Sequence, residues 1–285
     1  MRYSYYPGCT LKTQSGAALE LPALQAARVL GIELAEQDEW QCCGAVFPLT
    51  TDEIAPFLSS IRSLAAARDR GEKLVTLCAA CHHVIKRTNY LMQSNKDTRH
   101  KANNYLQLDQ PYSGEAEVIH YLELLRDEVG FDQVKAKVTN HLKERKIAPY
   151  YGCLLLRPAK IMAFDNAENP RIMEDLLLAL GAVPVDYPYR TECCGVYLSV
   201  NDENIAAKMV QKIVQSALDQ GAEAMVNACP LCHYNLLTLQ ELTPEGKPRL
   251  PVYYFTELLA EALGLAEETG GEKNENYDSA IKRGA

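Results

Sequence analysis

Short apolar runs alternate along this chain with longer stretches in which apolar residues recur at the helical period. The runs at 2–6 and 147–151 are rich in aromatic residues and end at a Gly-Cys pair, so they predict β-strands. The stretches 18–30 and 172–180 are each followed by a glycine that suits a helix end, so they predict helices. Each half of the chain therefore begins with a strand and a helix.

The alternation continues through both halves. Further strands are expected at 32–35, 74–77, 183–187 and 224–228. Between them lie two helices, which Asp52 and either Asn201 or Asp202 are expected to cap. These helices are expected to end near Gly71 and Gly221. Strands that alternate with helices favour parallel sheets and an α/β fold, in which ligands bind at the carboxyl ends of strands.

Ten cysteines occur at repeated positions in this pattern. Each half has a cysteine after its first strand, then a Cys-Cys-Gly motif, then a Cys-x-x-Cys motif. Cys9 and Cys153 are 144 residues apart, and each of the other four pairs is offset by 151. Five matches at a nearly constant offset indicate that one module has been duplicated.

The repeat divides the chain into two tandem, pseudo-symmetric modules that we expect to be Rossmann-like. The expected boundaries are 1–146 for the first module, 147–265 for the second and 266–285 for a polar tail. The segments 118–125 and 252–259 match at an offset of only 134, so the first module carries about 17 extra residues. We interpret the polar stretch 95–114 as this insertion and expect a surface loop there.

Composition narrows the classes of protein. Hydrophobic residues make up 47% and charged residues 23%, which is ordinary for a globular chain. The net charge of −8 disfavours a nucleic-acid surface. We find no apolar run long enough to span a bilayer and no signal-peptide pattern, so a cytoplasmic location is expected. The sixteen tyrosines are interpreted as core and interface residues.

In a reducing compartment, clustered cysteines typically bind metal or perform redox chemistry. A Cys-x-x-Cys between a buried strand and a helix could be half of a zinc site, a redox dithiol or half of an iron–sulfur site. The adjacent cysteines favour an iron–sulfur centre, because neighbouring side chains diverge and reach different irons more readily than one small ion. A fifth cysteine suggests a cluster that is not a cubane. Both Cys-x-x-Cys motifs precede histidine, as in c-type haem attachment, but haem would leave six cysteines unexplained.

The doubled cysteine pattern resembles the cysteine-rich CCG-domain family, and within it the B-type subunits of heterodisulfide reductases. The resemblance runs from Tyr3 to about Leu265 and includes Tyr151-Gly152-Cys153, the run 164–170 and the second Cys-x-x-Cys-His motif. It implies two non-cubane [4Fe-4S] clusters with five cysteine ligands each. By position, one set is Cys9, Cys42, Cys43, Cys78 and Cys81, and the other is Cys153, Cys193, Cys194, Cys229 and Cys232.

The resemblance also implies a function and partners in anaerobic metabolism. The chain is expected to be a catalytic oxidoreductase subunit that cleaves a disulfide by successive one-electron transfers between the clusters. Its electrons would come from a C-type [4Fe-4S] subunit and a flavin-containing A-type subunit, since we find no Gly-x-Gly-x-x-Gly motif for a flavin or nicotinamide here. The segments 44–48 and 195–199 differ from the methanogen members, which favours another disulfide or thiol at least as much as the coenzyme M–coenzyme B heterodisulfide.

Two further hypotheses concern the site. His82 and His233 lie beside cysteines and are candidate proton donors, although a supporting hydrogen bond to cluster sulfur is the favoured interpretation. The alternative function is an electron-relay or docking subunit that has no disulfide site of its own. Both functions predict the same ten cysteines.

Overall fold

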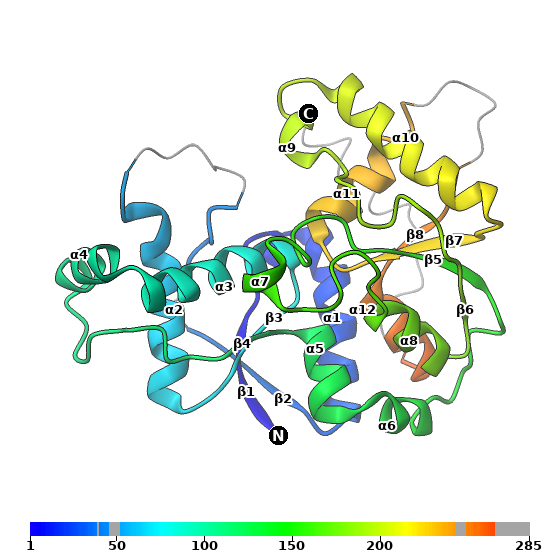
Figure 1. Cartoon of the computed structure of the whole chain (residues 1–285). Helices are drawn as coiled ribbons and strands as arrows, with labels where there is room; N and C mark the ends of the chain where they lie inside the picture. Colours follow the sequence, from blue (N-terminus) through cyan, green and yellow to red (C-terminus); the bar gives the residue numbers. More distant parts are fainter. Residues whose placement is uncertain (39, 46–51, 243–248, 266–285) are drawn as a thin grey trace.

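The computed structural model describes residues 1–38, 40–45, 52–242 and 249–265. It contains two four-stranded sheets, one in each module, and all of their strand pairs are parallel (Figure 1). The first sheet has the order β2-β1-β3-β4 and the second has the equivalent order β6-β5-β7-β8. The strands are β1 (Arg2–Tyr6), β2 (Glu33–Glu36), β3 (Leu74–Thr76), β4 (Val118–His120), β5 (Lys146–Tyr150), β6 (Val183–Pro184), β7 (Ala224–Asn227) and β8 (Val252–Tyr254).

These sheets confirm the predicted duplicated α/β fold. The strand order within each sheet is the flavodoxin-like variant of the doubly wound fold, whose switch point lies between the first and third strands. The fourth strands, β4 and β8, begin the 118–125 and 252–259 matches and were not predicted as strands. Three residues each are too few for an apolar run to distinguish a strand from a helix start.

Helices connect the strands and cover the sheets. The first module contains η1 (Thr10–Lys12), α1 (Gln14–Val29), α2 (Ala55–Arg70), α3 (Ala79–Ser94), α4 (Lys96–Leu106), α5 (Tyr121–Glu123), η2 (Leu124–Val129) and α6 (Phe131–Ala136). The second contains α7 (Ala159–Met162), α8 (Ile172–Ala179), α9 (Val196–Ser199), α10 (Glu203–Asp219), α11 (Pro230–Thr238) and α12 (Phe255–Ala262).

The predicted helix ends are observed. The Asp52 carboxylate accepts the amides of Ile54 and Ala55 at 2.9 and 2.8 Å where α2 begins. Of the two candidates for α10, Asp202 is the cap. Helix α2 ends at Gly71 in the left-handed conformation, which glycine adopts without a steric penalty.

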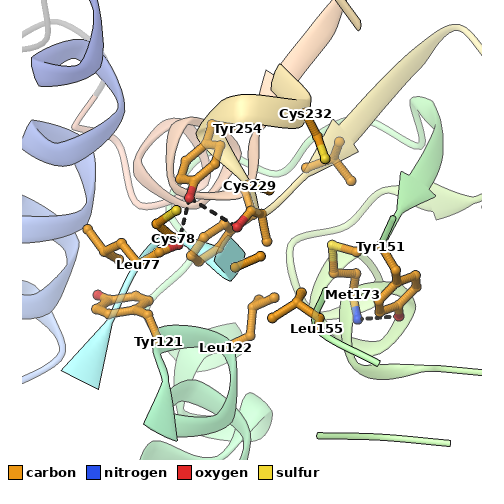
Figure 2. Close-up of a cluster of buried hydrophobic side chains, with 14 of the residues drawn as sticks. Leu77, Cys78, Tyr121, Leu122, Tyr151, Leu155, Met173, Cys229, Cys232 and Tyr254 are labelled. Carbon is orange, nitrogen blue, oxygen red and sulfur yellow. Dashed lines mark hydrogen bonds between the residues drawn. The ribbon is translucent and has the colours of Figure 1, made fainter. Parts of the chain in front are cut away.

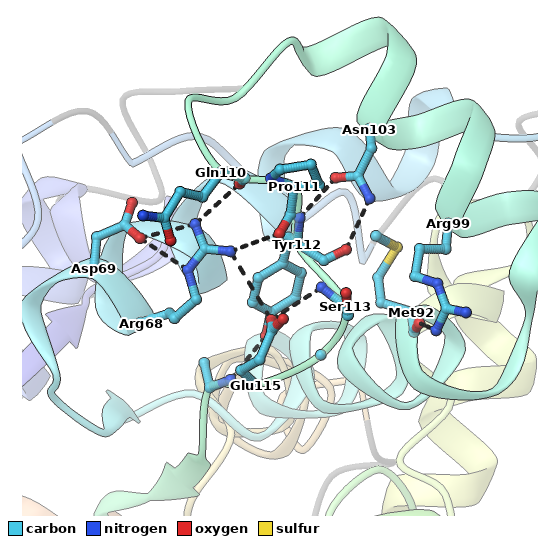
Figure 3. Close-up of polar contacts among 12 residues, drawn as sticks. Arg68, Asp69, Met92, Arg99, Asn103, Gln110, Pro111, Tyr112, Ser113 and Glu115 are labelled. Atoms are coloured by element: carbon cyan, nitrogen blue, oxygen red, sulfur yellow. Dashed lines mark hydrogen bonds and ion pairs between the residues drawn. The ribbon is translucent and has the colours of Figure 1, made fainter.

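The expected loop at 95–114 is wrong, because residues 96–106 form helix α4. The segment after α4 is also fixed in place (Figure 3). Arg68 donates to the carbonyls of Pro111 and Gln110 at 2.9 and 3.1 Å, and fully buried Tyr112 donates to Asn89 at 2.6 Å. Polar composition suggested a loop, but the Asn95 cap and the bonds between Asn103 and the Tyr112 backbone stabilise a helix.

The two modules pack through helices that come from opposite ends of the chain. Helix α1 of the first module lies against α12 of the second, and Thr256 donates to the carbonyl of Leu19 at 2.7 Å across this contact. Helix α8 in turn packs against α5 and α6. The buried apolar residues of both modules form one continuous core. The carboxyl ends of the two sheets are thereby held together. The expected tail, 266–285, lies outside the described residues.

Candidate iron–sulfur site

The first cysteine set gathers at the carboxyl end of the first sheet. Cys9 follows β1, the Cys42-Cys43 pair follows β2, and the Cys-x-x-Cys motif follows β3. The sulfur atoms of Cys9 and Cys42 lie 3.4 Å apart, and those of Cys43 and Cys81 lie 3.5 Å apart. Cys81 also hydrogen-bonds Cys78. The five predicted residues are therefore brought together at the topological switch point.

The second cysteine set repeats this arrangement after β5, β6 and β7. The sulfurs of Cys194 and Cys232 are 3.2 Å apart, equivalent to the Cys43–Cys81 contact. Cys193 raises the pKa of Cys153, and the thiols of Cys194 and Cys229 raise that of Cys232, so these cysteines lie close to one another. The five residues of the second set are therefore gathered like those of the first.

Each Cys-x-x-Cys motif sits at a helix start. Cys78 and Cys229 are the N-cap residues of α3 and α11. Free backbone N–H groups and the helix dipole favour negative charge at this position. The thiols of Cys232 and Cys78, and then the amides of Cys232 and Leu231, lower the pKa of Cys229 well below its usual value, whereas Cys229 and burial raise the pKa of Cys78. The start of α11 therefore favours thiolate sulfur at Cys229.

Both Cys-Cys-Gly motifs also direct a backbone amide at sulfur. Gly44 and Gly195 have φ of +76° and +77°, the left-handed region that glycine favours. In this conformation the Gly44 amide donates to Cys42 Sγ at 3.4 Å, and the Gly195 amide donates to Cys193 Sγ at 3.3 Å. The glycine after each cysteine pair thus supports a sulfur ligand.

Glycine is required at one further point of the first set. Gly8 has φ of +78°, and a Cβ atom there would lie 2.7 Å from the Cys81 sulfur. Any side chain at this position would displace the sulfur. Glycine therefore precedes Cys9 because the cysteine set leaves no space for a side chain there.

Two tyrosines hold the loops that carry the cysteine pairs. Tyr6 donates to the carbonyl of Gln41 at 2.5 Å, and Tyr150 donates to the carbonyl of Glu192 at 2.7 Å. Each carbonyl belongs to the residue just before a Cys-Cys pair. Sequence reasoning missed both residues by assigning the tyrosines to core and interface. The signal was available, since a tyrosine lies three residues before the first cysteine of each half.

The two cysteine sets meet where the modules join. The amide of Ala79 donates to the carbonyl of Ala228 at 3.1 Å, which joins the residue after Cys78 to the residue before Cys229. Figure 2 shows Cys78 and Cys229 side by side, beneath the ring of Tyr254. Tyr197 of α9 also lies near both sets, since burial and the charges of cysteines from both raise its pKa to about 12. The ten cysteines form one continuous sulfur-lined region.

The sets differ in exposure. Cys9 and Cys42 are exposed to solvent, whereas their counterparts Cys153 and Cys193 are partly buried. The remaining six cysteines are buried: Cys43, Cys78, Cys81, Cys194, Cys229 and Cys232. The first set is therefore the more accessible. The segment that follows Ala45, at 46–51, lies outside the described residues.

The two candidate histidines are buried and equivalent. His82 Nδ1 lies 3.2 Å from the Thr76 hydroxyl, and His233 Nδ1 lies 3.2 Å from the Asn227 amide. Burial lowers the pKa of His82 well below its usual value and lowers that of His233 to about 4. The other ring nitrogen of His82 faces the Glu123 carboxylate at 3.4 Å.

The donor set fits an iron–sulfur cluster. Five soft sulfur donors with backbone amides directed at them are the surroundings that such clusters have in proteins. A cluster extends over several iron atoms and so suits five sulfurs that gather at one edge of a sheet. Within the described ranges, no three Cys, His, Asp or Glu side chains are arranged as ligands of one metal ion.

Comparison with known proteins gives a match in both modules. The family model described as CCG, cysteine-rich domain, matches residues 3–86 and again residues 147–237. These two ranges contain all ten cysteines and more than half of the chain.

Relatives match over nearly the whole length. The chain is 34% identical to the 8-methylmenaquinol:fumarate reductase membrane anchor subunit of Wolinella succinogenes, covering 99% of each chain. It is 27% identical to the B subunit of a ferredoxin/F420H2-dependent CoB-CoM heterodisulfide reductase from Methanosarcina acetivorans, covering 96% of this chain and 93% of that one. In the part of the chain that the structure describes, no helix is both long and apolar enough to cross a membrane.

One solved structure shares the fold. The crystal structure of a hypothetical protein from Helicobacter pylori has a TM-score of 0.68 and 12% sequence identity. The match covers 96% of this chain but only half of that one. At this identity, the likeness concerns the fold alone.

Proposed function

Because the chain belongs to the CCG cysteine-rich domain family, we propose that it is the iron–sulfur subunit of a heterodisulfide reductase-type complex and cleaves a disulfide. Each cysteine set would hold one non-cubane [4Fe-4S] cluster through its five thiolates. The relatives named as B subunits of heterodisulfide reductases support this assignment. C-type iron–sulfur and flavin-containing A-type subunits would supply the electrons.

The observation that carries the proposal is the hydrogen bond from the Ala79 amide to the Ala228 carbonyl, which brings the two Cys-x-x-Cys motifs together at the module boundary. Reductive cleavage of a disulfide consumes two electrons and two protons and yields two thiols. When bound, two adjacent clusters would supply those electrons one at a time. The two cysteine sets meet at the module boundary. This arrangement suits a reaction in which one S–S bond breaks and each of its sulfurs leaves as a thiol.

The chain's own residues would hold the ligands and bring protons. Helix starts and glycine amides stabilise the thiolates, and Tyr6 and Tyr150 fix the loops that carry them. His82 is a candidate to hold a proton at its Nε2 atom. That atom faces Glu123, which pairs with Lys86 at 3.3 Å and so connects the buried ring to a partly exposed ammonium.

A second candidate function is an electron relay to a partner's active site. It is favoured by the relative at 34% identity, whose name states a quinol:fumarate reductase and no disulfide. In that case the two adjacent sets would conduct electrons, and the chain would bind no disulfide itself.

Anaerobic turnover separates the two functions. The purified chain, reduced by a viologen dye, would be given the coenzyme M–coenzyme B heterodisulfide and several low-molecular-weight disulfides. Catalysis predicts two thiols released for each disulfide consumed, and a Cys194→Ser control that releases none. A relay predicts dye-reducible clusters with no thiol release from any disulfide, which would contradict the catalytic proposal.

A further inference from the structure

A buried tyrosine joins the two modules beside the cysteine sets. The hydroxyl of Tyr254 reaches the carbonyl of Leu77 at 2.6 Å and that of Ala228 at 3.2 Å (Figure 2). These carbonyls belong to different modules, and each immediately precedes a cysteine, Cys78 or Cys229. Tyr254 has no exposed surface, and burial raises its pKa well above the usual value, so the hydroxyl remains a donor.

The residue equivalent to Tyr254 in the first module makes a related contact. His120 occupies the same place, at the last residue of the fourth strand and directly before a helix. Its Nδ1 accepts the amide of Leu122 at 3.2 Å, which leaves the proton on Nε2. Nε2 then donates to the same Leu77 carbonyl at 2.9 Å. Both equivalent residues therefore hold one carbonyl at the module boundary.

A proline explains why the Leu77 carbonyl needs these two side-chain donors. From the first module to the second, the Ala79 amide donates to the Ala228 carbonyl at 3.1 Å. Under the 151-residue repeat, the equivalent bond would run from residue 230 to Leu77. Residue 230 is proline and has no N–H to donate. A buried carbonyl without a donor is costly, and Tyr254 and His120 supply the donors.

We propose that Tyr254 is a positioning residue that forms an inter-module clamp, with His120 holding the Leu77 carbonyl from within the first module, and that this clamp sets the separation of Cys78 and Cys229. The clamp rests on the proposed function, since its consequence is the coupling between the two cluster sites. It acts on the backbone one residue before each cysteine. Loss of the Tyr254 hydroxyl would let the Cys-x-x-Cys motifs move relative to each other while every ligand stays in place.

The test compares three variants of the anaerobic holoprotein. Tyr254→Phe removes the clamp hydroxyl. Tyr254→Phe with Pro230→Ala restores an amide donor, because it gives the second motif the alanine that the first has at Ala79. Tyr112→Phe is the matched control, since it removes another buried hydroxyl in the insertion. The readouts are iron content, the spin–spin splitting between clusters by electron paramagnetic resonance, and amide exchange at Ala79.

Tyr254→Phe is expected to keep its iron but to change the splitting, and to raise Ala79 exchange about fivefold, the factor that one hydrogen bond represents. Pro230→Ala should reverse both changes, and Tyr112→Phe should cause neither. Full clusters with unchanged splitting and exchange in Tyr254→Phe would overturn the clamp. A wild-type protein without clusters would instead overturn the proposed function, and Ala79 exchange alone would then decide the clamp. If Tyr254→Phe does not fold, the double variant should fold and show the wild-type rate of Ala79 exchange, because its residue 230 amide replaces the lost donor, and a double variant that also fails to fold would overturn the clamp.

Discussion

The two modules have the same ligand scaffold and differ in what surrounds it. Strand order, left-handed glycines, tyrosine-held loops and helix starts recur in both. In the first module, however, two cysteines are exposed, whereas their counterparts in the second are partly buried. This difference teaches that duplication retained the arrangement of the cysteines and altered their exposure to solvent. The first set is the more accessible of the two.

The largest expected effect comes from removing one buried cysteine of either set. Cys43→Ser and Cys194→Ser each replace a soft thiolate with a hydroxyl that ionises at much higher cost. Each should perturb only its own cluster and lower disulfide turnover by at least about 100-fold, a larger loss than supporting residues of metal sites usually cause. Iron analysis and thiol release measure this. Wild-type turnover in either variant would show that the two sets do not act together.

Accessibility can be compared directly by iron chelation. Because Cys9 and Cys42 are exposed, we expect iron to leave in two phases, with the faster phase from the first set. The rates should differ several-fold. Absorbance of the iron–chelator complex follows the release, and Cys194→Ser identifies the phase that belongs to the second set. A single phase, or earlier loss from the second set, would contradict the difference in accessibility between the two sets.

The capping glutamates of the two modules predict different pH dependence. Glu123 and Glu257 accept the amides of His120 and Tyr254, but only Glu123 has a lysine beside it, Lys86. Burial raises the pKa of Glu257 to about 7, so the folded protein holds a proton that the unfolded chain releases above about pH 4.5. Stability should therefore fall as pH rises from about 4.5 to 7, by on the order of 2 kcal/mol.

The matched control for this prediction is Glu257→Gln, which keeps an acceptor for the Tyr254 amide and cannot ionise. Chemical unfolding at several pH values gives the unfolding free energy of the wild type and of the variant. The difference between these two free energies should disappear at low pH, where Glu257 is protonated. If the unfolding free energies of both proteins change equally with pH over the whole range, Glu257 does not titrate in this window.

The insertion gives the smallest expected effect. Tyr112→Phe removes a buried hydroxyl from Asn89 and should cost about 1 kcal/mol of unfolding free energy. Exposed Tyr105, on the same insertion, should tolerate serine without loss. Iron content should be unchanged in both variants, since the second module keeps its cysteine set without any such insertion. Iron loss in Tyr112→Phe would show that the insertion supports the first set.

Local signals in the sequence predicted most of the fold and all ten gathered cysteines. Glycine and aspartate marked the helix ends, and the cysteine repeat indicated the duplication. The insertion helix was missed because its polar residues become helical through contacts such as those of Asn103 with the Tyr112 backbone and of Arg99 with the Met92 carbonyl. The clamp could not be predicted from the sequence, because Leu77 and Tyr254 are 177 residues apart and meet only in the folded protein.

The central claim is that both cysteine sets hold clusters, and metal analysis tests it most directly. The anaerobically purified chain, expressed with ample iron and sulfide, would be assayed for iron, acid-labile sulfide and zinc. The account predicts about eight iron and eight sulfide per chain, four of each per cluster. Zinc without sulfide would contradict the account.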